Sequence, residues 1–305
     1  MRWAKRGVIH APDGTSDWAV QSALQPTPLR LSDDVVRLFV GFRDAVGVGR
    51  VGYIDVDANN PSRVLAVSQT PVLDVGVPGA FDDNGVIPSA VAQHGGRVYL
   101  HYAGYQLGVK VRFTVLGGLA VSDDGGQTFR RLGPVPALER TPEELFFRVA
   151  HTALYEDGRW RVWYGGGNRW VRDGEKTLPV YDIRYLESAD GMTFPRAGRV
   201  VMENAGPDEH RVARPYVIRH RGLYKMFYSI GTRSKTYRLG YAESPDGLAW
   251  RRLDATLGLD VSPGGWDSRM MAYSSVVLHG ERAYLFYNGN DYGATGVGYA
   301  ELESW

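Results

Sequence analysis

Charged residues recur at nearly equal intervals along this chain. They are Asp83, Arg148, Arg211 and Arg269, and they lie 65, 63 and 58 residues apart. A carboxylate can give or take a proton during catalysis, and a guanidinium binds a carboxylate or a phosphate through paired hydrogen bonds. If the fold brings these positions together, they form a site that combines acid–base groups with anion-binding groups.

Three carboxylates near these positions are the candidates for catalysis. Asp83, in the segment FDDNG, and Glu209, in GPDEHRVARP, are the best pair, and Asp267 is the third. Neighbouring arginines favour the ionised form of Glu209, which suits a base or a ligand-binding residue better than an acid.

A larger set of polar residues shares the same stretches of chain and could bind a ligand. These residues are Asn84, Arg148, His151, Arg211, Arg214, Arg269 and Tyr273. So dense a cluster of charge is costly to bury without partners, which favours a functional site. A network of ion pairs that braces adjacent parts of the fold would explain the same residues without a ligand, and that alternative stays open.

The spacing of these residues follows a repeat of about sixty residues that runs through the chain. Its marker is an aromatic-rich segment, seen as LFVGF, LHYAG, VWYGG, MFYSI and LFYNG. Each unit is long enough for four strands, and apolar residues alternate along it with the period of a packed strand. The repeat predicts an all-β fold, a five-bladed β-propeller of four-stranded antiparallel blades in a single domain that spans residues 1–305.

Turns built on Asp-Gly separate the third and fourth strands of three units. They read SDDGGQTF (122–129), SADGMTF (188–194) and SPDGLAW (244–250). Glycine accepts the positive φ of a tight turn, and the aspartate side chain can accept hydrogen bonds from backbone amides. We therefore interpret these aspartates as structural residues.

Composition excludes several classes of function. Lys plus Arg is 35 and Asp plus Glu is 34, a balance that predicts neither nucleic-acid nor membrane binding. The chain has no cysteine, and its seven histidines show no metal-binding motif, so we expect no cofactor and no catalytic metal. It shows no apolar stretch of signal-peptide or membrane-span length, so we expect a cytoplasmic location.

The number of units, the Asp-Gly turns and the segments FDDNGVIPS, ARPYVI, YAESPDG and LFYNGNDYG resemble the five-bladed propeller superfamily of glycoside hydrolases. That superfamily includes arabinanase, xylosidase, invertase, levansucrase and mannoside phosphorylase relatives, and the resemblance is closest to uncharacterised bacterial members. It implies three carboxylates on the inner strands of early blades, and a structural cation in the channel of some members. The first unit departs from the family pattern, because SDWAVQSALQPTPLRL (16–31) has no aspartate close to the strand.

Taken together, the residues and the resemblance predict a carbohydrate-active enzyme that cleaves or transfers a glycosyl residue in the central channel. We expect carboxylate acid–base chemistry beside an arginine-lined anion subsite, with Trp170 in a loop where it could stack on a sugar. The resemblance alone implies a furanosyl sugar. The arginines leave open phosphate-dependent transfer from a sugar phosphate by a phosphorylase or transferase, and the first unit leaves open a non-catalytic sugar-binding propeller. The expected partner is a small carbohydrate or a sugar phosphate.

Overall fold

The computed structural model describes residues 1–305, and nearly all of its regular structure is β-strand. Only two short helical segments occur, η1 (Asp254–Thr256) and α1 (Asn290–Gly293). No helix is long and apolar enough to cross a membrane. The prediction of an all-β chain is therefore confirmed.

The strands pair in antiparallel groups that follow the chain, each with four members. The first group is β2 (Ser22–Arg30), β3 (Val35–Arg43), β4 (Gly49–Asp57) and β5 (Val64–Val67). The second is β6 (Val86–His94), β7 (Arg97–Leu107), β8 (Phe113–Ser122) and β9 (Arg130–Arg131). The third is β10 (Phe147–Glu156), β11 (Arg159–Asp173), β12 (Lys176–Ser188) and β13 (Arg199–Met202). The fourth is β14 (Glu209–His220), β15 (Leu223–Thr232), β16 (Arg238–Ser244) and β17 (Arg251–Arg252).

The fifth group joins the two ends of the chain. It consists of β18 (Ala272–His279), β19 (Arg282–Asn288), β20 (Val297–Ser304) and the N-terminal strand β1 (Arg2–His10). Strand β1 pairs antiparallel with β20, from Arg2 opposite Ser304 to His10 opposite Val297. This strand could not be predicted from the repeat, which gives no sign that the outer strand of the last unit comes from the other end of the chain.

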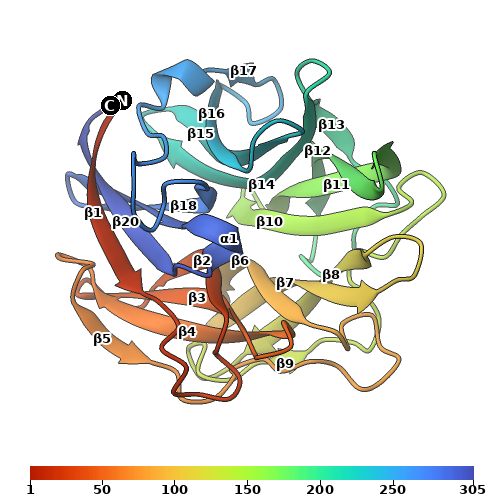
Figure 1. Ribbon diagram of the computed structural model, residues 1–305, viewed down its shortest axis with the longest axis horizontal. Helices are drawn as coiled ribbons and strands as arrows, with labels where there is room; N and C mark the ends of the chain where they lie inside the picture. Colours follow the sequence, from red (N-terminus) through yellow and green to blue (C-terminus); the bar gives the residue numbers. More distant parts are fainter.

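Figure 1 shows the groups arranged around a common centre, with β2, β6, β10, β14 and β18 closest to it. Hydrogen bonds define three sheets, of four, twelve and four strands. The large sheet forms because short parallel contacts join β8 to β10 and β12 to β14. The predicted four-stranded antiparallel groups are thus present, but three of them are joined into one twelve-stranded sheet.

The hydrophobic core lies between neighbouring groups. Phe39 of the first group and Leu100 of the second are fully buried in one cluster, and Trp163 of the third packs with Tyr228 of the fourth in another. Burial of such large side chains is the main favourable term in folding, at about 25 cal/mol per Å² of apolar surface. Each group therefore depends on its neighbours for stability.

The Asp-Gly turns have the structural role that the sequence predicted. Asp124 accepts hydrogen bonds from the backbone amides of Gln127 and Thr128, at 2.9 and 3.0 Å. Asp190 and Asp246 make the same pair of contacts in their own turns. These bonds favour the ionised carboxylate, so the aspartates stabilise turns at the outer edge of the molecule.

Candidate ligand-binding site

Each of the five innermost strands contains a register shift, where the pairing with the next strand skips one or two residues. Such bulges turn a side chain away from its regular direction, and they are common next to functional sites. The first residues skipped at these shifts are Gln25, Ser89, His151, Arg214 and Tyr273, which we call the bulge ring. Gln25, Arg214 and Tyr273 have positive φ angles of 61°, 51° and 58°, which is strained for residues other than glycine.

The bulge ring borders a cavity of about 520 Å³, a size typical of small-molecule sites. All of its members except the fully buried Ser89 line the cavity. Aromatic side chains form much of the wall, and they are Tyr105, Phe113, Phe147, Trp170, Tyr181, Tyr237 and Tyr292. The cavity therefore offers flat apolar surfaces together with hydrogen-bonding groups.

All the charged side chains that line the cavity are positive. No aspartate or glutamate contributes to it, whereas five cationic residues do, namely Arg43, Arg112, Lys176, Arg211 and Arg214. A concave site with walls of low polarity strengthens the field of such charges. The cavity is therefore suited to an anionic ligand.

Arg214 is the most unusual of these cations because it is almost completely buried, at 1% exposure. Its Nη2 donates to the carbonyl of Pro26 at 2.8 Å and contacts the hydroxyl of Thr27 at 3.1 Å, while Nε and Nη1 have no partner. It makes no ion pair with a carboxylate, and burial lowers its pKa to about 9, which leaves it cationic at neutral pH. An uncompensated buried charge is costly, so an anion is expected to bind beside it.

Arg211 and His151 add further unpartnered groups. The guanidinium of Arg211 lies 4.4 Å from the ring centre of Tyr237, and its Nε has no hydrogen-bond partner. The Nδ1 of His151 has none either. Burial, followed by the charges of Arg214 and His101, lowers the pKa of His151 well below its usual range, so this histidine is neutral at pH 7.

The structure brings together only part of the site predicted from the sequence. The residues that line the cavity are Asn84, His151, Trp170, Arg211, Arg214 and Tyr273. The residues that do not are Asp83, Arg148, Glu209, Asp267 and Arg269. All three carboxylates predicted to be catalytic belong to the second set.

Two of these carboxylates have contacts that a folding role explains. Glu209 receives two hydrogen bonds of 2.9 Å from Arg252. Asp267, at 1% exposure, accepts from Lys5 at 2.7 Å and from the Tyr287 hydroxyl at 2.9 Å. The contacts of Glu209 lie within the fourth group and those of Asp267 connect to strands of the fifth, so each stabilises its own group. Catalysis by either residue stays a prediction that these contacts do not favour.

Asp83 differs from the other two carboxylates. One of its oxygens accepts from the backbone amide of Gly79 at 2.8 Å, and the other is buried without a partner. Next to it, Asn84 lines the cavity and accepts from the amide of Leu107 at 3.0 Å. Asp83 therefore adjoins the cavity in sequence but contributes no surface to it.

Two of the predicted arginines belong to ion pairs, the alternative that the sequence left open. Arg148 is buried against Glu144 and donates to the carbonyls of Glu139 and Pro195, each at 2.7 Å. Arg269 is exposed and pairs with Asp291. The expected arginine ring is thus reduced to Arg211 and Arg214.

The arginines that the repeat aligns lie a few residues before the positions that face the centre. His151 and Arg214 each follow an aligned arginine by three residues, and Tyr273 follows its own by four. The bulges account for the difference, because an extra residue in a strand changes which side chains point inward. A proline inside a strand is a known sign of a bulge, and Pro26, Pro88 and Pro215 all adjoin a member of the bulge ring. That signal could have located three of the five positions.

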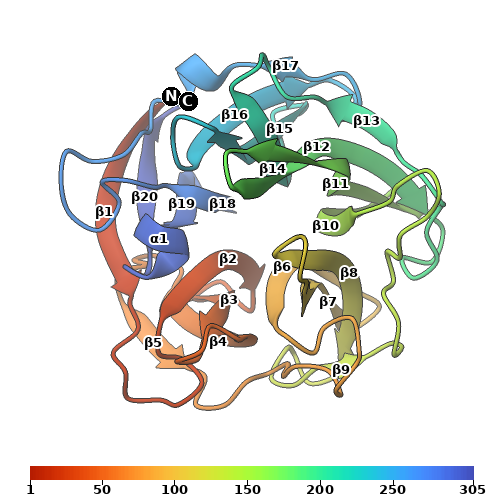
Figure 2. The same cartoon turned by 45° about the vertical axis from the view of Figure 1, so that its right-hand side comes forward.

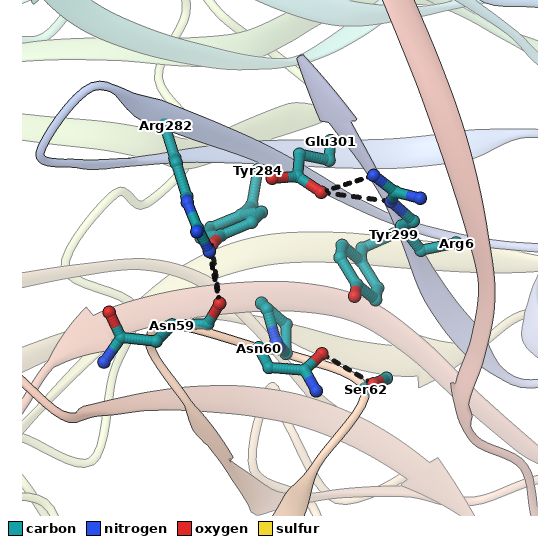
Figure 3. Close-up of a pocket in the computed structure, with 9 residues that line it drawn as sticks. Arg6, Asn59, Asn60, Ser62, Arg282, Tyr284, Tyr299 and Glu301 are labelled. Carbon is teal, nitrogen blue, oxygen red and sulfur yellow. Dashed lines mark hydrogen bonds and ion pairs between the residues drawn. The ribbon is translucent and has the colours of Figure 1, made fainter. Parts of the chain in front are cut away.

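A second pocket lies at the outer surface, where the fifth group meets the loop after β4 (Figure 3). Its polar groups bond to one another: Arg6 pairs with Glu301 at 2.8 Å, and Arg282 donates to the carbonyl of Asn59 at 2.7 Å. No buried group in it lacks a partner. The contacts in this pocket therefore join the fifth group, which contains both ends of the chain, to the loop after β4.

No group of three or more His, Asp or Glu side chains is placed where it could hold a metal ion. The expectation of no cofactor stays a prediction, as does the channel cation that the family resemblance implied.

Comparison with solved structures identifies the fold class. A structure described as a glycoside hydrolase is 20% identical, with a TM-score of 0.71 over 98% of this chain and 90% of that one. The GH43_1 enzyme from Xanthomonas citri in complex with xylose is 18% identical, with a TM-score of 0.64 over 97% and 90%. The resemblance to propeller glycoside hydrolases is therefore confirmed as a likeness of fold.

Comparison of sequences places the chain more closely. The uncharacterized protein Rv1502 of Mycobacterium tuberculosis is 34% identical over 304 residues, which cover the full length of both chains. The chain belongs to the same family as Rv1502. No model of a described protein family matches the sequence.

Proposed function

We propose that this chain is a carbohydrate-active protein whose central cavity binds a negatively charged sugar. The observation that carries the proposal is the lining of the cavity, which contains five cationic side chains and no carboxylate. Arginine suits carboxylate and phosphate groups, and aromatic walls suit the apolar faces of sugar rings. The fold shared with glycoside hydrolases supports a carbohydrate as the ligand.

The proposal includes the architecture. The five antiparallel groups act as the five blades of one propeller, and β1 closes the ring by completing the last blade. The bulge ring repeats at spacings of 64, 62, 63 and 59 residues, one residue to a blade. In this arrangement the cavity lies on the axis, which is where propellers carry their sites.

The sequence predicted hydrolysis by a pair of carboxylates. We propose instead that the cavity binds a sugar and does not hydrolyse it in this way. Glycoside hydrolysis generally needs two carboxyl groups beside the scissile bond. The innermost strands carry acidic residues only near their ends, at Glu156 and Glu209, and neither lines the cavity. Burial raises the pKa of Tyr273 well above its usual range, and His151 is neutral, so neither is a strong acid or base at pH 7.

Phosphate-dependent glycosyl transfer is the second candidate. The cationic lining favours it, because a sugar phosphate or free phosphate carries the charge that these arginines bind. This candidate differs from pure binding in one measurable way, since it requires turnover of the bound sugar phosphate.

Calorimetry with the purified chain tests the proposal. Glucose, glucuronic acid and glucose 6-phosphate are titrated at low and moderate salt. In a separate assay, glucose 1-phosphate, whose phosphate leaves from the anomeric carbon, is mixed with a sugar acceptor and followed by NMR for new anomeric signals and released phosphate. We expect the two charged sugars to bind, with affinity that falls as salt rises, and glucose to bind far more weakly. Equal affinity for glucose, or no affinity for any charged sugar, would refute the proposal. New anomeric signals together with released inorganic phosphate in the glucose 1-phosphate mixture would favour the transferase.

A further inference from the structure

The depth of the unpartnered groups in the cavity indicates how a ligand lies in it. We infer that the negative charge of the ligand sits at the innermost end, against Arg214, Gln25 and His151, so that the ligand is a glycan or glycoside whose terminal sugar carries a carboxylate or phosphate away from its anomeric carbon. This inference rests on the proposed function, because it takes the ligand to be an anionic sugar.

Arg214 lines the buried, inner part of the cavity. It lies on β14, yet its Nη2 bonds to Pro26 and Thr27 of β2. These strands belong to the fourth and first groups, which face each other across the centre (Figure 2). Of the cations that line the cavity, Arg214 is the most buried, whereas Arg112 and Lys176 are exposed. A ligand that enters past the exposed cations therefore reaches Arg214 with its leading end.

The innermost groups have donors without acceptors. They are Nε and Nη1 of Arg214 and Nε2 of Gln25, and beside them lies the unpartnered Nδ1 of His151, which donates in one of the two neutral tautomers. Arg214 is 1% exposed and Gln25 is 6% exposed, so water reaches neither freely. Buried donors in proteins nearly always have partners, and a set left open around one cavity marks the place of an absent acceptor. A carboxylate or phosphate supplies several acceptor oxygens at once.

An aromatic wall and two exposed cations form the outer part of the cavity. Trp170 is half-buried and lies 5.4 Å from Phe113 and 5.3 Å from Phe147, measured between ring centres, which makes a wall against which a sugar ring can lie. Arg112 and Lys176 line the cavity but are exposed, so they mark its outer end. A ligand therefore enters with its charged group first and keeps its anomeric substituent towards solvent.

Calorimetry with matched probes tests this orientation. The probes are inorganic phosphate, glucuronic acid, its methyl glycoside, glucose 6-phosphate and glucose 1-phosphate. We expect the methyl glycoside and the 6-phosphate to bind at least roughly tenfold more tightly than the 1-phosphate, a difference of about 1.4 kcal/mol. A preference between the uronate and the 6-phosphate tells whether the natural charge is a carboxylate or a phosphate. Preference for the 1-phosphate would overturn the inference.

Variants locate the charge independently. Arg214→Met is expected to weaken binding of these sugars by roughly a hundredfold, whereas Arg112→Gln and Lys176→Gln, which remove exposed cations of the same cavity, change it by less than about fivefold. The melting temperature of Arg214→Met without ligand should not fall, because the substitution removes an unpaired buried charge. Gln25→Leu provides a second, uncharged test if Arg214→Met does not fold.

The outcomes separate the two proposals. If charged sugars bind and only the Arg112 and Lys176 variants lose affinity, the charge lies at the outer end, so the inference is wrong and the proposed function stands. If none of the charged probes, phosphate included, binds to the unaltered chain, both are wrong. A fall in melting temperature without a loss of affinity would assign Arg214 to folding alone.

Discussion

Two regions of this protein, the starts of the inner strands and the bulge ring, differ in how their charges are balanced. The set at the starts of the inner strands, which we call the paired set, consists of Arg148 with Glu144, Glu209 with Arg252, and Asp267 with Lys5. In the bulge ring, a few residues further along each strand, Arg214 has no acidic partner. Charged residues near the inner strands therefore do not by themselves indicate a binding site. What marks the candidate site is charge that the protein leaves unbalanced.

The largest expected effect comes from breaking the paired set. Glu144 is fully buried and contacts both Arg148 and Arg184, so Glu144→Gln leaves the buried Arg148 without a counter-charge, while Arg184 keeps its pair with Asp182. We expect the free energy of unfolding to fall by about 3–5 kcal/mol, measured by urea denaturation. The neighbouring Glu143→Gln breaks an exposed pair with Arg196 and should cost less than about 1 kcal/mol. Similar losses in both variants would contradict this account.

Stability should also depend on pH through the histidines near the bulge ring. Burial lowers the pKa of His101 to about 4. Between pH 6.5 and 4 the unfolded chain binds a proton that the folded chain excludes, so stability decreases as the pH falls through this range. The loss from His101 is about 3 kcal/mol, measured as the free energy of unfolding at pH 7 and pH 4.

His101→Phe is the matched variant for that titration. Phe39, Phe227 and Phe286 occupy the corresponding position in other units, so phenylalanine suits the site. The variant should show a shallower fall in stability between pH 7 and pH 4 than the unaltered chain. An unchanged slope would show that His101 is not the group responsible.

Glu209→Gln distinguishes the catalytic role of Glu209 that the sequence predicted from the folding role that its contacts with Arg252 indicate. If Glu209 serves folding, removing its paired bonds to Arg252 should lower the free energy of unfolding by about 1–2 kcal/mol and leave sugar binding unchanged. Thermal unfolding and calorimetry on the same sample measure both. A loss of binding or turnover with stability intact would return Glu209 to the active site.

The smallest effect concerns the aromatic wall beside the bulge ring. Trp170→Ala should weaken binding of a charged sugar by about 1 kcal/mol, roughly fivefold, because it removes one stacking surface and leaves the cations in place. Binding of inorganic phosphate serves as the control, since it needs no ring contact and should not change. An equal loss for phosphate would mean that Trp170 supports the arginines and not the sugar.

Much of the fold could be predicted because its signals are local. The aromatic repeat indicated strands in units of about sixty residues, and the Asp-Gly turns fell where they were expected, with Asp124, Asp190 and Asp246 bonded to the turn amides. The candidate site was predicted in part. Arg211, Arg214, His151, Tyr273, Trp170 and Asn84 do line the cavity. The carboxylates do not, because the sequence cannot show whether Glu209 meets Arg252, 43 residues away, or a ligand.

The all-β class, the repeat and the chemistry of the turns follow from the sequence alone, because each depends on neighbouring residues and on the two-residue period of a strand. The pairing of the charges, the strand that completes the last group and the residues that face the centre are set by the tertiary structure. Those outcomes depend on bulges that shift the inward phase of a strand, and on contacts between residues up to the full length of the chain apart.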